Sequence, residues 1–419
     1  MGSVILLINV TTIVAVKRFA DQQMFFIKQV SKVNYWLKLY DENLIQFTMD
    51  SEVGEGLTTT ILWYAEDKAH LFPIDFLSAP DFKEMDKTKI SLVKWLEKRI
   101  IPKNRQFVEE ILKLYGLSIN NVKGIIDVCK GLSLNDSYWV VPENFQGKFA
   151  DYNLYENKFS KALSLVAYTG VGSGRTPFTT SPEYTTGGML RKAWRSMNGK
   201  IVLSKGGTSG AANTGLEPYS EYYACQVAEK MGLAPVMYDL KMWKGEIVST
   251  CELFTDIDTA FVYIGRIVKT GGYKAVLQWA NSQSKEMFDY FCSMLCFDAI
   301  VYNEDRHFGN FGVLRNNKTG KIIRHAPIFD HGMSLFNYGM ADDLKDLEQY
   351  RESRRAHGGE NFDEIVKAFC GKKQKEQLKK LLGFKFTKHT SYNWPSERHK
   401  MIERFIGQRV QELLNMIQD

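Results

Sequence analysis

The chain has 419 residues, of which 44% are hydrophobic and 13% aromatic, and its formal net charge is +6. This composition supplies enough apolar surface for two or three domains and excludes an intrinsically disordered protein. Lysines and arginines are spread along the chain rather than gathered in a basic arm, so direct nucleic-acid binding is not expected. The six cysteines form no CxxC pair, which indicates reduced thiols and a cytoplasmic protein.

Residues 1–145 are predicted to form an accessory region that is β-rich first and helical afterwards. Apolar and aromatic runs that favour strands occupy residues 4–10, 24–30, 35–40, 58–64 and 70–76. From residue 92 to 132 the apolar spacing becomes helical, with an interruption at Pro102. The apolar stretch near the N-terminus is too short to cross a bilayer, so no membrane contact is expected.

Residues 146–255 predict a compact lobe of antiparallel strands with one inserted helix. Two turn dipeptides, Asn198-Gly199 and Lys244-Gly245, mark hairpins in this lobe. The expected elements are a strand ahead of the Gly187-Gly188 turn, strands at 192–194, 200–205, 236–240 and 247–254, and a helix from Glu217 or Ser220 to Gly232.

Residues 256–419 are predicted to be mainly helical. Helical spacing covers residues 274–282 and 284–302, and amphipathic runs recur at 362–370 and 401–417. The fold class is therefore α+β, with a β-rich lobe followed by a helical lobe and preceded by the accessory region.

One polar stretch, from Phe297 to Leu335, interrupts this helical part. Asp305 follows a helical segment at a polar turn, Asn310 precedes an apolar strand, and a hairpin then returns the chain to Asp330. Carboxylates and amides beside buried strands are costly unless something satisfies them. Their oxygens are the hard ligands that hold Mg²⁺ together with a phosphate, which is the arrangement that phosphoryl transfer needs. The alternative interpretation is that these side chains only cap turns.

The β-rich lobe supplies groups that would face such a site. Glycines in the Thr186-Gly187-Gly188 turn could lay backbone N–H groups over phosphate oxygens, although a plain hairpin turn is the alternative. Lys205 ends an apolar strand and would point an ammonium into the same cleft, with Lys192 as a second phosphate contact. Three further positions complete this set, namely Glu221 or Glu217 as the partner of Lys205, and Glu252 and Phe254 at the junction where an adenine would meet the connecting strand.

These motifs resemble those of the HipA-like kinases, and more distantly those of phosphatidylinositol kinases. The matching segments, in chain order, are TTGGMLRK (185–192), IVLSK (201–205), the helix that carries Glu221, CELF (251–254), NEDRHFGN (303–310) and PIFDHG (327–332). The resemblance implies a bilobal protein-kinase-like fold over residues 146–255 and 256–419. This sequence departs from those of protein kinases because it lacks a Gly-x-Gly-x-x-Gly loop and has His331, instead of Phe, after Asp330.

The resemblance also implies roles for individual residues. Asp305 becomes the catalytic Asp in a motif that includes His307, and Asn310 and Asp330 become the magnesium ligands. Lys205 becomes the ATP lysine, and Thr186 to Gly188 the phosphate-covering loop.

The function implied by the resemblance is transfer of phosphate from Mg-ATP to Ser or Thr of a protein. Some members are toxins restrained by a DNA-binding antitoxin, and some phosphorylate themselves in the loop over ATP. Here the hydroxyls for self-modification would be those of Thr179, Thr180, Ser181, Thr185 and Thr186. A phosphoinositide kinase and an inactive kinase-fold binding module are the alternatives.

Overall fold

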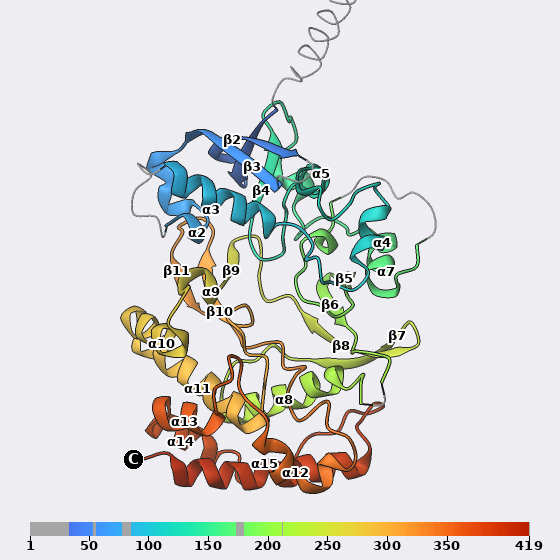
Figure 1. The fold of residues 1–419 in the computed structure, drawn as a ribbon, viewed down its shortest axis with the longest axis vertical. Helices are drawn as coiled ribbons and strands as arrows, with labels where there is room; N and C mark the ends of the chain where they lie inside the picture. Colours follow the sequence, from blue (N-terminus) through green and yellow to red (C-terminus); the bar gives the residue numbers. More distant parts are fainter. Residues whose placement is uncertain (1–32, 53–55, 78–84, 173–179, 212, 419) are drawn as a thin grey trace, which may run out of the picture.

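The computed structural model describes residues 33–52, 56–77, 85–172, 180–211 and 213–418. Figure 1 shows an accessory region at the top, a sheet-containing middle and a helical lower part. The strands expected at residues 4–10 and 24–30, and the candidate hydroxyl of Thr179, lie outside the described residues.

The accessory region is built on a four-stranded antiparallel sheet of order β3-β2-β1-β4. Its strands are β1 (Asn34–Leu39), β2 (Glu42–Glu52), β3 (Gly56–Tyr64) and β4 (Tyr138–Pro142), and its helices are α3 (Met85–Glu97), α4 (Val108–Lys113) and α5 (Val122–Cys129). Burial alternates along β1, so one face of the sheet packs on a core. The strand expected at 70–76 is wrong. A 3-10 turn (Glu66–Leu71) and α2 (Ile74–Leu77) stand there, because Pro73 cannot donate to a strand ladder but suits a helix start.

The middle of the molecule contains a second antiparallel sheet, of order β5-β6-β8-β7. Its strands are β5 (Lys192–Met197), β6 (Lys200–Lys205), β7 (Asp239–Trp243) and β8 (Glu246–Glu252), accompanied by α6 (Phe149–Tyr152), α7 (Lys161–Thr169) and α8 (Glu217–Met231). Both predicted hairpin turns are present, with positive φ at Asn198, Gly199, Lys244 and Gly245.

Two strand predictions in this lobe are corrected by the structure. A 3-10 turn, Pro182–Tyr184, replaces the strand expected ahead of Gly187, since proline presets a turn and removes a ladder donor. The strand expected at 236–240 begins only at Asp239, because the preceding residues bridge to the polar stretch through Pro235 and Ile328.

The chain from residue 256 onward combines a small sheet with helices, which confirms the α+β class. The strands β9 (Thr259–Tyr263), β10 (Gly312–Asn316) and β11 (Ile322–His325) form a sheet of order β11-β10-β9, and β9 was not predicted. The helices are α9 (Ile264–Ile267), α10 (Gly272–Gln283), α11 (Lys285–Val301), α12 (Leu347–Glu352), α13 (Phe362–Phe369), α14 (Lys372–Lys379) and α15 (Ser396–Met416), with a 3-10 turn at Asp343–Asp346. Helix α11 is the centre of the largest core, with both sides of its C-terminal half buried.

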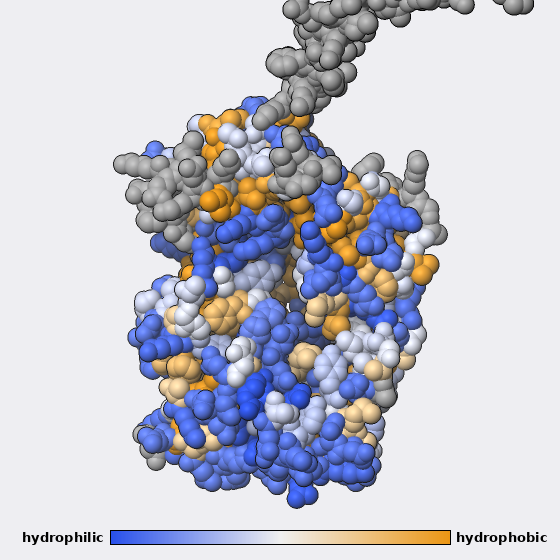
Figure 2. All heavy atoms as spheres, in the orientation of Figure 1, coloured by the Kyte–Doolittle hydropathy of each residue, from blue (hydrophilic) through white to orange (hydrophobic). Residues whose placement is uncertain are grey.

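The surface and the division of the chain follow from this arrangement. On the face drawn in Figure 2, hydrophilic residues cover most of the helical lower part, and hydrophobic surface gathers higher up. Among the described residues no helix has the length and apolarity to cross a membrane. The boundaries near residues 145 and 255 stay predictions; β4 and β8 end shortly before them.

Candidate functional site

One cleft of about 820 Å³ receives side chains from the accessory region, the middle sheet and the helical part. The twelve residues predicted as catalytic, nucleotide-binding or metal-binding all line this cleft: Thr186, Gly187, Gly188, Lys192, Lys205, Glu221, Glu252, Phe254, Asp305, His307, Asn310 and Asp330. Positions up to about 145 residues apart in the sequence are thus brought to one place by the fold.

Lys205 joins three elements at the centre of the cleft. It is the last residue of β6, and its ammonium lies 2.7 Å from Oε1 of Glu221 on α8 and donates also to Oδ1 of Asp330. Burial alone would lower the pKa of Lys205, but the carboxylates of Asp330 and Glu221 outweigh burial and raise it above its usual value. Burial raises the pKa of Glu221, against the opposing effect of Lys205, and Ser249 donates to its second oxygen.

The sequence had left Glu217 and Glu221 open as partners of Lys205, and the structure selects Glu221. Glu217 lies one helical turn earlier and is also buried. Its Oε1 instead accepts hydrogen bonds from the hydroxyls of Thr208, at 2.7 Å, and Tyr338, at 3.0 Å. It therefore ties the loop after β6 to the segment that follows Asp330.

The segment from Asn303 to Asn310, predicted to be catalytic, folds into a tight turn that holds its polar groups toward the cleft. The amide nitrogen of Asn310 donates to the main-chain oxygen of Asp305 at 2.9 Å, which leaves the amide oxygen of Asn310 for another partner. Asp330 has the left-handed φ of 57°. Burial, aided by the negative charge of Asp330, raises the pKa of Asp305. Burial opposes ionisation of Asp330, but Lys205 and Lys192 outweigh it and hold the pKa of Asp330 below its usual range.

His307 contacts the turn itself. Its ring Nδ1 accepts a hydrogen bond from the backbone N–H of Gly309 at 2.9 Å, and the backbone N–H of His307 donates to the main-chain oxygen of Asp305 at 2.8 Å. This geometry indicates that His307 shapes the loop that carries Asp305 and Asn310.

Arg306 is the central residue of this segment that sequence reasoning missed. It is buried, and its guanidinium bonds both carboxylate oxygens of Asp298 at 2.9 Å. The same group donates to the main-chain oxygens of Asn310, at 3.0 Å, and Phe329, at 2.7 Å, and contacts Nδ1 of His331 at 3.1 Å. One side chain therefore connects the backbone beside both predicted metal ligands. The only signal for Arg306 in the sequence is that its partner Asp298 stands in an otherwise apolar stretch of a helix.

His331 occupies the position where protein kinases have Phe. Burial and the positive charge of Arg306 hold the pKa of His331 well below its usual value, so the ring is neutral. The ring packs against Phe297 and Tyr238, with centroids 5.1 and 6.2 Å away, and thus fills an aromatic position.

The glycine turn lies over Lys192. The Lys192 ammonium donates to the Gly187 oxygen at 2.9 Å, and a Cβ added at Gly188, whose φ is +84°, would lie 2.3 Å from that ammonium. Lys192 is also the antiparallel neighbour of Lys205 on β5 and β6. Burial, reinforced by the positive charge of Lys205, lowers the pKa of Lys192 to about 7.

At the predicted adenine site, Glu252 offers its main chain and Phe254 its side chain. The carboxylate of Glu252 bonds Lys200 at 2.6 Å, and both side chains are about 60% exposed, so its main chain is what can face the cleft. Phe254 packs on Phe261 and Phe329, with centroids 5.4 and 5.6 Å away, and forms an apolar wall.

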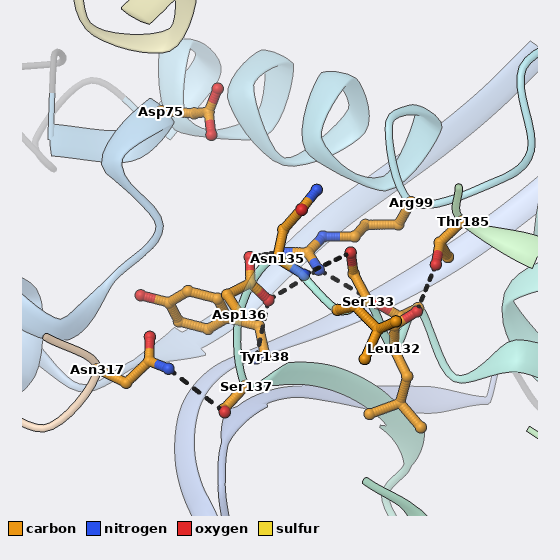
Figure 3. Close-up of polar contacts among 12 residues, drawn as sticks. Asp75, Arg99, Leu132, Ser133, Asn135, Asp136, Ser137, Tyr138, Thr185 and Asn317 are labelled. Carbon is orange, nitrogen blue, oxygen red and sulfur yellow. Dashed lines mark hydrogen bonds and ion pairs between the residues drawn. The ribbon is translucent and has the colours of Figure 1, made fainter. Parts of the chain in front are cut away.

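The accessory region lines the cleft as well, which the sequence did not reveal. Figure 3 shows the hydroxyl of Thr185 bonded to the main-chain oxygen of Leu132, at 2.8 Å. In the same view the buried pair Arg99–Asp136 braces the segment that carries Ser133. Ser133 and its neighbours Leu134 and Asn135 are among the lining residues.

Comparisons with known proteins agree with the motifs. No family model matches the chain. Over 140 residues the chain is 31% identical to the serine/threonine-protein kinase CtkA of Helicobacter pylori (strain J99), a match that covers 30% of this chain and 42% of that kinase. The chain thus spans less than half the length of this curated relative.

Two solved structures match the chain. A crystal structure of the Helicobacter pylori proinflammatory kinase CtkA matches with a TM-score of 0.43 and 18% identity, over 54% of this chain and 92% of that one. HipA of Shewanella oneidensis MR-1, solved with HipB and operator DNA, matches with a TM-score of 0.50 and 11% identity, over 91% of this chain and 99% of that one. The fold over nearly the whole chain is therefore that of HipA, and over 140 residues the sequence is similar to a serine/threonine-protein kinase.

Proposed function

We propose that this chain is a Mg-ATP-dependent kinase that phosphorylates Ser or Thr of a protein. The observation that carries the proposal is the convergence on one cleft of Lys205, its partner Glu221, and the acidic pair Asp305 and Asp330. Phosphoryl transfer relies on positioning and on electrostatic stabilisation, and these are the groups that supply both.

The residues present fit magnesium brought in with a nucleotide. Asp330 and Asn310 offer two hard oxygen ligands. Among the described residues no group of three or more His, Cys, Asp or Glu could hold a metal ion. Mg²⁺ sites in kinases use one or two protein oxygens and complete the shell with phosphate and water. Bound there, Mg²⁺ would neutralise charge that develops on the phosphate.

Each side chain then has a definite task. Asp305 orients the acceptor hydroxyl and accepts its proton, a role that its raised pKa favours. Lys205 holds phosphate charge and is itself held by Glu221. Gly187 and Gly188 let the backbone approach the phosphates. The ammonium of Lys192, which contacts the oxygen of Gly187, adds a second positive charge beside that of Lys205.

The test is incubation of the full chain with labelled ATP and Mg²⁺, with the protein itself and lysate proteins as acceptors. Asp305→Asn should reduce transfer by about 100-fold or more while nucleotide binding persists. Asp330→Asn should weaken Mg²⁺-dependent nucleotide binding. Asp342→Asn is the matched control, because this side chain is 89% exposed and lies outside the cleft. Equal nucleotide binding by all four proteins, with no transfer by any, would contradict the proposal, and labelling of phosphoinositide vesicles alone would favour a lipid kinase.

We also propose self-modification in the loop over the nucleotide. The hydroxyls of Thr185 and Thr186 donate to main-chain oxygens of Leu132 and Pro182, so the loop has to open before either can accept phosphate. Phosphopeptide mapping of the wild type after incubation with Mg-ATP should find residues 179–186 modified, and the Asp305→Asn protein should carry no phosphate there.

We further propose that this kinase is a toxin that a DNA-binding partner restrains. This proposal rests on the fold match to the Shewanella HipA, whose structure contains HipB and operator DNA. Induced expression of the wild type should slow growth, expression of Asp305→Asn should not, and co-expression of a DNA-binding protein encoded beside the kinase should restore growth. Normal growth with active kinase would contradict this role.

A further inference from the structure

A buried ion pair connects the accessory region to the glycine turn. Arg105, in the segment between α3 and α4, and Glu183, in the 3-10 turn ahead of Gly187, have side chains that are 0% exposed. Their guanidinium and carboxylate are 2.6 Å apart. Two charges removed from water in this way are retained only where the geometry satisfies nearly all of their hydrogen bonds.

The remaining hydrogen bonds of this pair go to the backbone on both sides of residues 185–191, which we call the phosphate loop. Arg105 donates to the main-chain oxygens of Glu183, at 2.9 Å, Thr186, at 3.3 Å, and Lys192, at 2.9 Å. The second carboxylate oxygen of Glu183 accepts the N–H of Trp194 at 2.7 Å. The guanidinium therefore fixes the start and the end of the phosphate loop relative to each other.

A second contact from the same segment reaches the tip of the loop. The N–H of Gln106 donates to the main-chain oxygen of Met189 at 2.9 Å. Near the start of the loop, the hydroxyl of Thr186 accepts from the Trp194 indole at 3.0 Å. The loop is thus held at its start, its tip and its end, and Arg105 and Gln106, which hold it from the accessory region, are not among the residues that line the cleft.

We propose that Arg105, supplied by the accessory region, is a positioning residue for the nucleotide: it fixes the phosphate loop so that Gly187, Gly188 and Lys192 face the cleft before ATP binds. The proposal rests on the proposed function. A loop ordered in advance costs less conformational entropy when the ligand binds, so its loss weakens ATP binding. Saturating ATP can order the loop by its own contacts, and turnover at saturation is then little changed.

The alternative is that the pair only attaches the accessory region to the lobe. Arg409 provides the matched control, because it is equally buried and also joins segments through a main-chain oxygen, that of Ala299 at 3.1 Å, and through the carboxylates of Asp363 and Glu412. None of these partners lines the cleft. A purely structural arginine should behave as Arg409 does.

The experiment compares the full-length wild type with Arg105→Lys, Glu183→Gln and Arg409→Lys. The Lys variants keep the positive charge and lose the planar fork. The measurements are the thermal midpoint, the Kd of a fluorescent N-methylanthraniloyl ATP with Mg²⁺, and KM and kcat for ATP. Arg105→Lys should raise Kd and KM about tenfold, the factor that corresponds to one lost hydrogen bond of this kind, with kcat changed less than about threefold. Arg409→Lys should lower the thermal midpoint and leave Kd within about twofold.

Glu183→Gln keeps one oxygen that can accept from Trp194, and it removes both the charge and the second acceptor oxygen that hold Arg105. It should raise Kd in the same direction, and it decides the question if Arg105→Lys does not fold. Equal Kd values in all variants, or an equal rise in Arg105→Lys and Arg409→Lys, would overturn the positioning role. Failure of the proposed function is recognised separately, since the wild type itself would then transfer no phosphate, whatever Kd it shows for the nucleotide.

Discussion

Replacement of Arg306 by Met tests whether one buried arginine organises the predicted metal ligands. The guanidinium is nearly unexposed and makes two bonds to Asp298, each 2.9 Å long, and one each to the oxygens of Asn310 and Phe329. Arg306→Met leaves the Asp298 carboxylate, which is 3% exposed, without its cation. Breaking a buried pair on one side costs about 3–5 kcal/mol. For a lobe of this size that corresponds to a fall in the thermal midpoint of roughly 6–20 °C.

A second substitution separates the loss of stability from the loss of positioning. In Arg306→Met/Asp298→Asn the buried carboxylate becomes an amide that needs no cation, and Asn303 still donates to its oxygen, 3.0 Å away in the wild type. Most of the thermal stability should therefore return. The backbone oxygens of Asn310 and Phe329 remain unheld, and a displacement of about 1 Å at a catalytic group can reduce the rate by about 100-fold.

The assay measures the thermal midpoint and kcat of the wild type, Arg306→Met, Asp298→Asn and the double variant. We expect the double variant to recover stability without recovering transfer. If stability and kcat return together, Arg306 is only the counterion of Asp298, and its bonds beside Asn310 and Asp330 do not position the metal ligands.

Three further predictions concern the nucleotide half of the cleft. Gly188→Ala should raise KM for ATP several-fold, because a Cβ at φ +84° is strained and would lie on the Lys192 ammonium, whereas Gly187→Ala, with nothing within 4 Å, should change KM less than about twofold. Burial lowers the pKa of Lys192 to about 7, and only the protonated form attracts phosphate. KM for ATP should therefore rise between about pH 6 and 8 in the wild type and stay high and constant in Lys192→Gln. A parallel rise in both proteins would contradict this assignment. Glu252→Ala should leave KM for ATP within about twofold, since its carboxylate forms only an exposed pair with Lys200; a tenfold rise would show that the side chain binds the nucleotide.

The residues that we predicted to carry chemistry could be singled out in the sequence because they stand at the ends of locally patterned elements. Lys205 ends an apolar strand, and Asp305 and Asn310 flank a polar turn before another strand. Such positions are visible from periodicity and turn residues alone. The resemblance to HipA-like kinases rested on the same positions, and the fold match to HipA and the partial sequence match to a serine/threonine-protein kinase agree with it.

Other features escaped prediction because their cause is not local. Glu217 and Glu221 are one helical turn apart and share a face, so the sequence could not tell which one meets Lys205. The short strand β9 pairs with β10, about fifty residues further on, and with nothing nearby in the chain. The wrong strands at 70–76 and ahead of Gly187 both contain a proline, and its effect on the backbone outweighed the apolar pattern.

The two buried arginines show why positioning residues are the hardest to find in a sequence. Arg306 bonds main-chain oxygens beside the predicted metal ligands, and Arg105 bonds main-chain oxygens on both sides of the phosphate loop. Every residue has a backbone oxygen, so the residue type of the partner does not reveal that an arginine binds it. In addition, Arg105 and Lys192 are 87 positions apart, and no local pattern connects them. Each half of the cleft is therefore built from residues whose chemistry can be recognised locally, and is held in place by an arginine whose role depends on tertiary contact. Because Arg105 belongs to the accessory region, residues that carry no chemistry of their own become part of the nucleotide half of the site.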